Sequence, residues 1–153
     1  MESWNFKIEK RPNEITERLE SELNSIGGFV FDKKNPTTFS FRKRVLYAWY
    51  MAFQNWTIVN GKLSSNSTDN TTNVKISFNQ HFLIRLIIYT HIILGLGLIL
   101  GLFITTKNEP STYIVGGLII ALGIVIWITT KRKFKKDAEK YKGLITDTFG
   151  LYK

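Results

Sequence analysis

The chain of 153 residues contains no cysteine. Disulfide cross-links and thiolate catalysis are therefore excluded, although the absence does not identify a cellular compartment. The first ten residues, MESWNFKIEK, also lack a basic segment followed by an apolar core. For this reason the sequence does not predict a cleaved signal peptide.

Several motifs of enzyme chemistry are missing as well. No phosphate-binding loop or dinucleotide fingerprint occurs outside an apolar run, and no nucleophile elbow is present. The two histidines, His81 and His91, are ten positions apart and show no metal-ligand spacing. We therefore expect no metal, no cofactor and no enzymatic activity. A Ser–His–acid triad formed only by folding stays open at this level.

Charge is absent from two long stretches, residues 86–106 and 113–130, which contain no Lys, Arg, Asp or Glu. A helix of about 21 residues spans roughly 30 Å, the thickness of a bilayer core. The connecting KNEPST is short and contains Pro110, as expected of a turn. The sequence predicts a two-helix transmembrane hairpin within residues 82–130. Two buried helices of a soluble domain are less favoured, because they would form most of its core.

Positive charge is plentiful, with 21 Lys and Arg against 12 Asp and Glu and a net charge of +9. The densest cluster, KRKFKK, directly follows the second apolar run, whereas the connecting loop carries only Lys107. This asymmetry predicts that both termini are cytoplasmic. It also favours membrane topology over nucleic-acid binding, so no nucleic-acid partner is expected. The residues expected at the membrane interface are Arg85, Trp127, Lys131, Arg132 and Lys133.

Small residues recur at four-residue spacing in both predicted spans. Gly97 and Gly101 form one pair, and Gly117 and Ala121 form the other. Small residues let helices approach closely in lipid, so these pairs indicate packing within the hairpin or a self-association face. His91 lies in the first span, where an ionisable residue is a functional candidate. A neutral histidine hydrogen-bonded to a neighbouring helix is the simpler interpretation.

Outside the hairpin the pattern is that of an α+β domain. Residues 4–8 alternate apolar and polar, and a helix is predicted from RPNEITERLESELNSIGG, with an apolar stripe of Ile15, Leu19, Leu23 and Ile26. GFVFDKKNPTTFSFRKR resembles a β-hairpin, and further strands are expected in NWTIVNGKL and NVKISFN, with Asn60-Gly61 as a turn or bulge signal. Residues 131–153 predict an amphipathic helix, with a stripe of Phe134, Ala138, Tyr141, Ile145, Thr148 and Tyr152.

The stretch RKRVLYAWYMAFQNW has two interpretations. As a strand it is apolar on both faces and suits the centre of a sheet. As a helix it presents an aromatic stripe suited to the lipid interface. Flanking strand signals favour the strand. In either case the cations suit phosphate or lipid headgroups and the aromatic side chains suit an apolar ligand. The candidate binding residues are Arg42, Lys43, Arg44, Tyr47, Trp49 and Phe53.

The predicted fold class is α+β: a small antiparallel sheet of about five strands with N- and C-terminal helices, interrupted by a two-helix transmembrane hairpin. Residues 1–81 and 131–153 form the cytoplasmic domain. This order, with FQNWTIVNGKL followed by a polar loop, a strand and two spans, resembles that of uncharacterised small bacterial membrane proteins. The resemblance implies no activity.

Three function classes follow. The leading hypothesis is a non-enzymatic inner-membrane protein whose cytoplasmic domain binds a protein partner, or an apolar or anionic ligand, at the bilayer surface. The alternative is a membrane-disrupting effector of a bacterial defence system, triggered through that domain and self-associating through its membrane helices. A membrane enzyme acting on lipids has no visible nucleophile or metal set.

Overall fold

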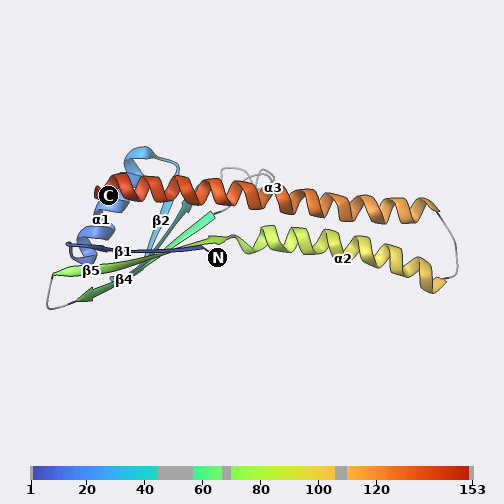
Figure 1. Ribbon diagram of the computed structural model, residues 1–153, viewed down its shortest axis with the longest axis horizontal. Helices are drawn as coiled ribbons and strands as arrows, with labels where there is room; N and C mark the ends of the chain where they lie inside the picture. The colour runs from blue at the N-terminus through green and yellow to red at the C-terminus, as the bar shows by residue number, and fades with distance from the viewer. Residues whose placement is uncertain (1, 45–56, 67–69, 106–109, 152–153) are drawn as a thin grey trace. The chain divides into compact units, whose positions relative to one another are not determined.

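A computed structural model describes residues 2–44, 57–66, 70–105 and 110–151 (Figure 1). Tyr47, Trp49 and Phe53, with the choice between strand and interfacial helix for residues 45–56, lie outside this range. The chain divides into two compact units. An α+β unit comprises Met1–His81 and Phe134–Lys153, and a helical unit comprises Phe82–Lys133. The elements in chain order are β1 (Glu2–Ile8), α1 (Pro12–Ile26), β2 (Phe29–Asn35), β3 (Thr38–Lys43), β4 (Thr57–Asn66), β5 (Thr71–Gln80), α2 (Phe82–Thr105) and α3 (Pro110–Phe149).

The α+β unit contains a five-stranded antiparallel sheet in the order β1-β5-β4-β3-β2. The α+β class and the antiparallel sheet predicted from the sequence are confirmed. Strands β2 to β5 form a meander, while β1, first in the chain, pairs with β5 in a register from Glu2 opposite Phe78 to Ile8 opposite Thr72. The long connection α1 carries the chain from one edge of the sheet to the other, which leaves β1 and β2 as the two edge strands.

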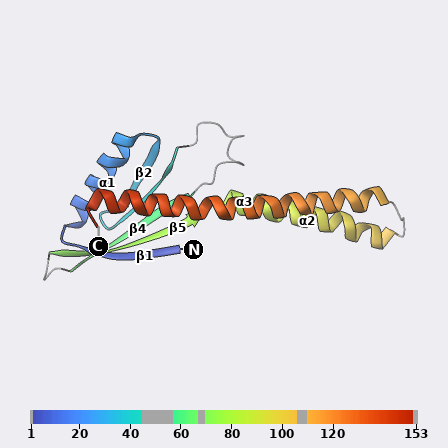
Figure 2. The same cartoon turned by 45° about the horizontal axis from the view of Figure 1, so that its top comes forward.

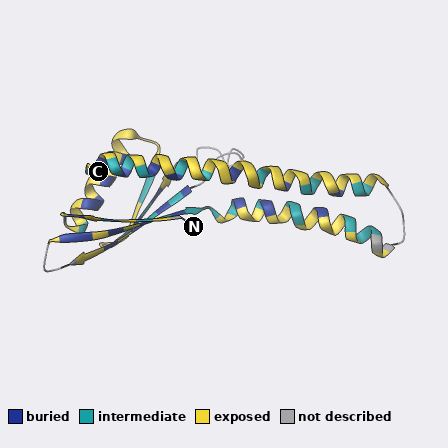
Figure 3. Cartoon of the chain, in the orientation of Figure 1, coloured by how far each residue is buried: buried dark blue, intermediate teal, exposed yellow. Residues whose placement is uncertain are grey.

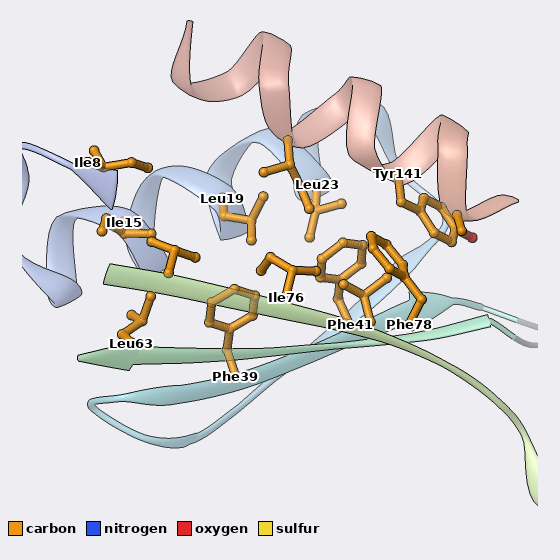
Figure 4. Close-up of a cluster of buried hydrophobic side chains, with 14 residues drawn as sticks. Ile8, Ile15, Leu19, Leu23, Phe39, Phe41, Leu63, Ile76, Phe78 and Tyr141 are labelled. Atoms are coloured by element: carbon orange, nitrogen blue, oxygen red, sulfur yellow. The ribbon is translucent and has the colours of Figure 1, made fainter. Parts of the chain in front are cut away.

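One face of the sheet forms the core. Alternate residues of the strands point toward α1 and the C-terminal part of α3, as Figure 4 shows, because strand side chains alternate between faces. Burying a large apolar side chain contributes about 1.5 to 3 kcal/mol, so this face accounts for most of the unit's stability. The most deeply buried large apolar residues of the core, from the sheet and from the two helices together, are Phe41, Phe78, Ile15, Leu19, Leu23, Ile76, Ile145, Val59 and Val74.

Tyr141 closes the core from α3. Its ring lies 6.0 Å from that of Phe29 and 5.8 Å from that of Phe41, both in edge-to-face geometry. Aromatic pairs of this kind add about 0.5 to 1.5 kcal/mol to the burial of their area. Burial, and secondarily the negative charge of Asp137, raises the pKa of Tyr141 to about 12. Ala138, Ile145 and Thr148 of the predicted stripe are also buried. Tyr152 lies outside the described residues.

Asn60-Gly61, interpreted from the sequence as a turn or bulge, lies instead in the middle of β4. Gly61 is paired with Phe39 of β3 on one side and Ile76 of β5 on the other. The Phe39 ring covers Gly61, so a Cβ at that position would collide with it. A glycine is thus used where an aromatic ring lies flat on the sheet, a pairing that compensates for the weak strand propensity of glycine. Ile26 also departs from expectation, since 53% of it is exposed.

Helix α3 continues without a break from Pro110 to Phe149, so the boundary predicted at residue 131 is not a helix end. The reason is local. Neither glycine nor proline occurs between Gly123 and Gly143, and the KRKFKKDAEKYK segment is rich in good helix formers. Helix α2 likewise begins before the first predicted span, since it starts at Phe82 and includes Arg85.

In the helical unit, α2 and the N-terminal part of α3 pack against each other at three glycines. A Cβ on Gly95 would lie 2.7 Å from the carbonyl oxygen of Gly116, and one on Gly116 would lie 3.0 Å from that of Gly95. Farther along, a Cβ on Gly123 would lie 3.1 Å from the Cβ of His91. The two backbones therefore approach closely, as small residues permit. The remaining surface of both helices is largely exposed (Figure 3).

Candidate functional site

The predicted helix-packing residues do not lie at this helix contact. Nothing lies within 4 Å of a Cβ placed on Gly97, Gly101 or Gly117, and Ala121 is exposed. A shift of two residues changes the side of a helix by about 200°, since each residue advances the chain by about 100°. Packing within the hairpin therefore uses Gly95 in place of Gly97. The four predicted positions are left on the outer surface of the helical unit.

The outer surface of the helical unit is apolar. Both helices are long and apolar enough to cross a membrane. The apolar 18-residue stretch of each has a mean hydropathy of 2.2, and only 17% of that stretch in α2 and 11% in α3 is buried. Among the described residues, every exposed large apolar side chain except Ile26 lies on α2 or α3. Soluble proteins seldom expose a contiguous apolar area of this kind.

Cations mark the end of this apolar surface. On α3, Trp127 is 52% exposed, and the Lys131 Nζ lies 5.8 Å from the centre of its ring. This cation–π pair contributes about 0.5 to 1 kcal/mol where it is exposed. Lys131, Arg132 and Lys133 are exposed, as is Arg85 in the second turn of α2. An aromatic ring beside lysine and arginine is the composition found where helices leave the bilayer core.

His91 has a local partner. Its Nδ1 lies 2.8 Å from the carbonyl oxygen of Ile87, one turn earlier on α2, and donates a hydrogen bond to it. This partner lies on the same helix and not on the neighbouring helix. The bond satisfies one ring nitrogen inside an apolar segment.

The three predicted binding cations of the α+β unit do not form one cluster on the sheet. Arg42 and Lys43 are successive residues of β3, so their side chains leave opposite faces. Arg44 follows the strand, and its backbone N–H donates a hydrogen bond of 2.7 Å to Gly28. Burial, and secondarily the charge of Arg42, lowers the pKa of His81. Arg42 is therefore the member of the three that faces a titratable neighbour.

A different polar surface stands out: the sheet face opposite the core. Figure 2 shows α1 beside the C-terminal part of α3, and the groove between these helices is lined by residues of both. With both helices on the core face, no other described element of the α+β unit covers the other side of the sheet. We call that side the open face; its members include Ser3, Asn5, Lys7, Val30, Asp32, Asn35, Thr38, Ser40, Arg42, Ile58, Asn60, Lys62, Ser64, Asn73, Lys75, Ser77 and Asn79.

The strand registers order these side chains into rows. The central row runs across all five strands and contains Asn5, Lys75, Lys62, Thr38 and Asn35 in direct cross-strand pairs. A second row on one side joins Lys7, Asn73 and Ser64. A third, on the other side, joins Ser3, Ser77, Asn60, Ser40 and Asp32. The described side chains of the open face are therefore mostly polar, with Val30 and Ile58 as the apolar exceptions, and Asp32 on edge strand β2 is the one described carboxylate among them.

Two shallow hollows lie on the open face. One, of about 610 Å³, is lined by Lys7, Lys62 and Lys75, and the other, of about 560 Å³, by Lys34, Lys62 and Lys75. Lys62 and Lys75 are thus shared by both hollows. Lys7, Lys62 and Lys75 are exposed. The surface can hold anions through ammonium groups and through amide and hydroxyl donors.

The sequence contained part of this signal. Lys62, Asn73, Lys75 and Ser77 occupy the polar positions of alternating strands, which ordinarily indicate only solvent exposure. What sequence reasoning missed is that Lys62 and Lys75 become direct neighbours, because register is decided by strand pairing.

Among the described residues, no three His, Asp or Glu side chains come together in a group that suits a metal ion. The chain matches no protein-family model and shows no significant sequence similarity to a curated protein.

Proposed function

We propose that this chain is a two-span integral membrane protein that displays a small α+β domain on the cytoplasmic side of a bacterial inner membrane. The domain acts by binding, not by catalysis. One observation carries the proposal: the large apolar side chains of α2 and of the first part of α3 face outward. In water this surface would be strongly unfavourable, whereas in hydrocarbon it removes its apolar area from water at about 25 cal/mol per Å².

The orientation follows from the cations beside the helices. Arg85 and the cluster from Lys131 to Lys136 flank the apolar segments at the side joined to the α+β unit, while the connecting residues carry Lys107 and Glu109. Bacterial membrane proteins retain Lys- and Arg-rich flanks in the cytoplasm. Both chain termini and the sheet are therefore assigned to the cytoplasmic side.

The lack of cysteine provides a direct test of topology. Ser21 on α1 and Ser111 near the start of α3 are both exposed, so Ser21→Cys and Ser111→Cys form a matched pair. A membrane-impermeant maleimide should label Ser111→Cys in intact spheroplasts and Ser21→Cys only in inverted vesicles. The protein should also stay in the membrane fraction after alkaline carbonate extraction. Labelling of Ser21→Cys from outside, or release by carbonate, would refute the proposal.

A further inference from the structure

Lys62 and Lys75 lie directly opposite each other on β4 and β5. Like charges in this arrangement destabilise a sheet, because their Cβ atoms are only about 5 Å apart. Lysines often protect the edges of sheets from aggregation, but β4 and β5 are interior strands of this sheet and have no exposed edge. Edge protection therefore does not account for the pair.

The surroundings of the pair are those of an anion site. Lys7 adjoins it in one hollow and Lys34 in the other, so each hollow is lined by three lysines. Between the lysines lie short side chains that donate hydrogen bonds, including Asn5 and Asn73 in one hollow and Ser40 in the other. Phosphate oxygens accept hydrogen bonds from ammonium, amide and hydroxyl groups, and charged bonds of this kind are the strongest.

We propose that the open face of the sheet binds a soluble ligand carrying at least two phosphate groups. The ligand bridges the two hollows, and Lys62 and Lys75, which both hollows share, hold it at the centre. Lys7 and Lys34 contact its two ends. This inference rests on the proposed function of the α+β domain as a binding module, and it adds the position of the site and the chemistry of its ligand.

The composition of the open face favours a compact soluble ligand over a nucleic acid or a bilayer surface. The described rows of the open face contain no aromatic side chain, so bases of a single-stranded nucleic acid would find no stacking platform. Surfaces that lie on lipid combine cations with exposed aromatic or aliphatic side chains. Here the two aliphatic side chains in the rows of this face, Val30 and Ile58, are only half-exposed. The short donors also lie between long lysines, where a small ligand reaches them more easily than a flat bilayer does.

The test uses the full chain in nanodiscs of zwitterionic lipid, with inorganic tripolyphosphate as the probe in isothermal titration calorimetry. The wild type should bind the probe with a Kd below about 1 mM, which is a modest affinity. Lys62→Gln/Lys75→Gln should weaken binding at least about tenfold, because two charge-assisted contacts are lost. Each single substitution should show part of this loss.

The matched control is Lys33→Gln/Lys140→Gln, which also removes two positive charges, but from exposed positions outside the open face. Its Kd should stay within about twofold of the wild type. Equal weakening in both double variants, or no binding by the wild type, would overturn the proposal. Binding to anionic-lipid vesicles but not to tripolyphosphate would assign the face to the membrane surface and also overturn it. Membrane extraction and maleimide labelling are measured separately, so failure of this site is distinguishable from failure of the proposed topology.

Discussion

Phe41 and Leu118 are both large apolar residues, yet 1% of Phe41 and 60% of Leu118 is exposed. Phe41 belongs to the α+β unit, where apolar and polar side chains alternate and the apolar ones point inward. Leu118 belongs to the helical unit, where the contact between helices is made by glycines and the large side chains point outward. The difference supports the proposal that the two units face different solvents. One excludes water from its centre, and the other presents hydrocarbon to its surroundings.

The largest effect that separates the two units is expected from Phe41→Ala. Loss of this buried ring should cost about 3 to 5 kcal/mol of the stability of the α+β unit. Hydrogen exchange should then show reduced protection of the β3, β4 and β5 amides, with α2 amides unchanged. If α2 lost protection to the same extent, the two units would unfold together and the comparison would break.

A charge on the helical unit tests its solvent directly. Leu118→Lys on the outer side of α3 should oppose membrane insertion by about 2.5 to 3.5 kcal/mol. The variant should be depleted from the carbonate-resistant membrane fraction and accumulate less in cells. Lys140→Leu on the exposed part of α3 in the α+β unit is the opposite change and should leave the fraction unaltered. Normal insertion of Leu118→Lys would mean that α3 does not face lipid.

The glycine contact in the helical unit separates packing from self-association. Gly95→Ala places a Cβ 2.7 Å from the backbone oxygen of Gly116, so the helices must move apart. We expect a cost of about 1 to 3 kcal/mol and a lower melting temperature in detergent. Gly97→Ala, with open space around it, is the matched control and should leave the melting temperature unchanged.

A larger substitution at Gly97, which lies on the outer side of α2, tests for self-association. If Gly97→Leu leaves protein levels unchanged but abolishes a higher oligomer in cross-linking, or abolishes toxicity, the outward glycines serve self-association. In that case the membrane-disrupting effector would replace the anchored binding module as the preferred function.

A smaller effect is expected from pH, and only in the α+β unit. The pKa of Tyr141 is raised to about 12, so folding favours its neutral form. The resulting stabilisation is complete below pH 10, where the hydroxyl is neutral in both states, and is lost as the pH rises toward 12. After allowance for solvent screening the loss is about 1 to 2 kcal/mol. Denaturant unfolding of the wild type should show it between these pH values, and Tyr141→Phe should not.

The smallest effect concerns the open face. Lys62→Gln removes the like-charge pair with Lys75 and should stabilise the sheet by about 0.2 to 1 kcal/mol at low salt. The gain should shrink at high ionic strength, because exposed charges are screened. A destabilised Lys62→Gln would show that this lysine contributes to the fold, and the like-charge pair would then be no sign of a binding site.

The sequence by itself determined the type of most elements, although it divided α3 at residue 131 and placed a turn or bulge inside β4. Alternation in residues 4–8, 29–31, 39–41 and 74–78 is sufficient for strands, because one buried face has a period of two. The uncharged runs determined two helices apolar enough for a membrane, and the stripe from Ile15 to Leu23 determined the buried side of α1. These features are local, so they can be read without knowing what lies opposite.

Only the tertiary structure decided which residues of different elements contact one another. The strand order, the position of Gly61 under Phe39 and the juxtaposition of Lys62 with Lys75 follow from register, which links residues far apart in the chain. Whether Gly95 or Gly97 lies at the contact between the helices depends on how one helix is rotated against the other. The sequence leaves this rotation open, because it offers glycines on both sides of α2. Local propensity identifies a strand or a helix, whereas the free energy of pairing and packing decides which of its residues meet.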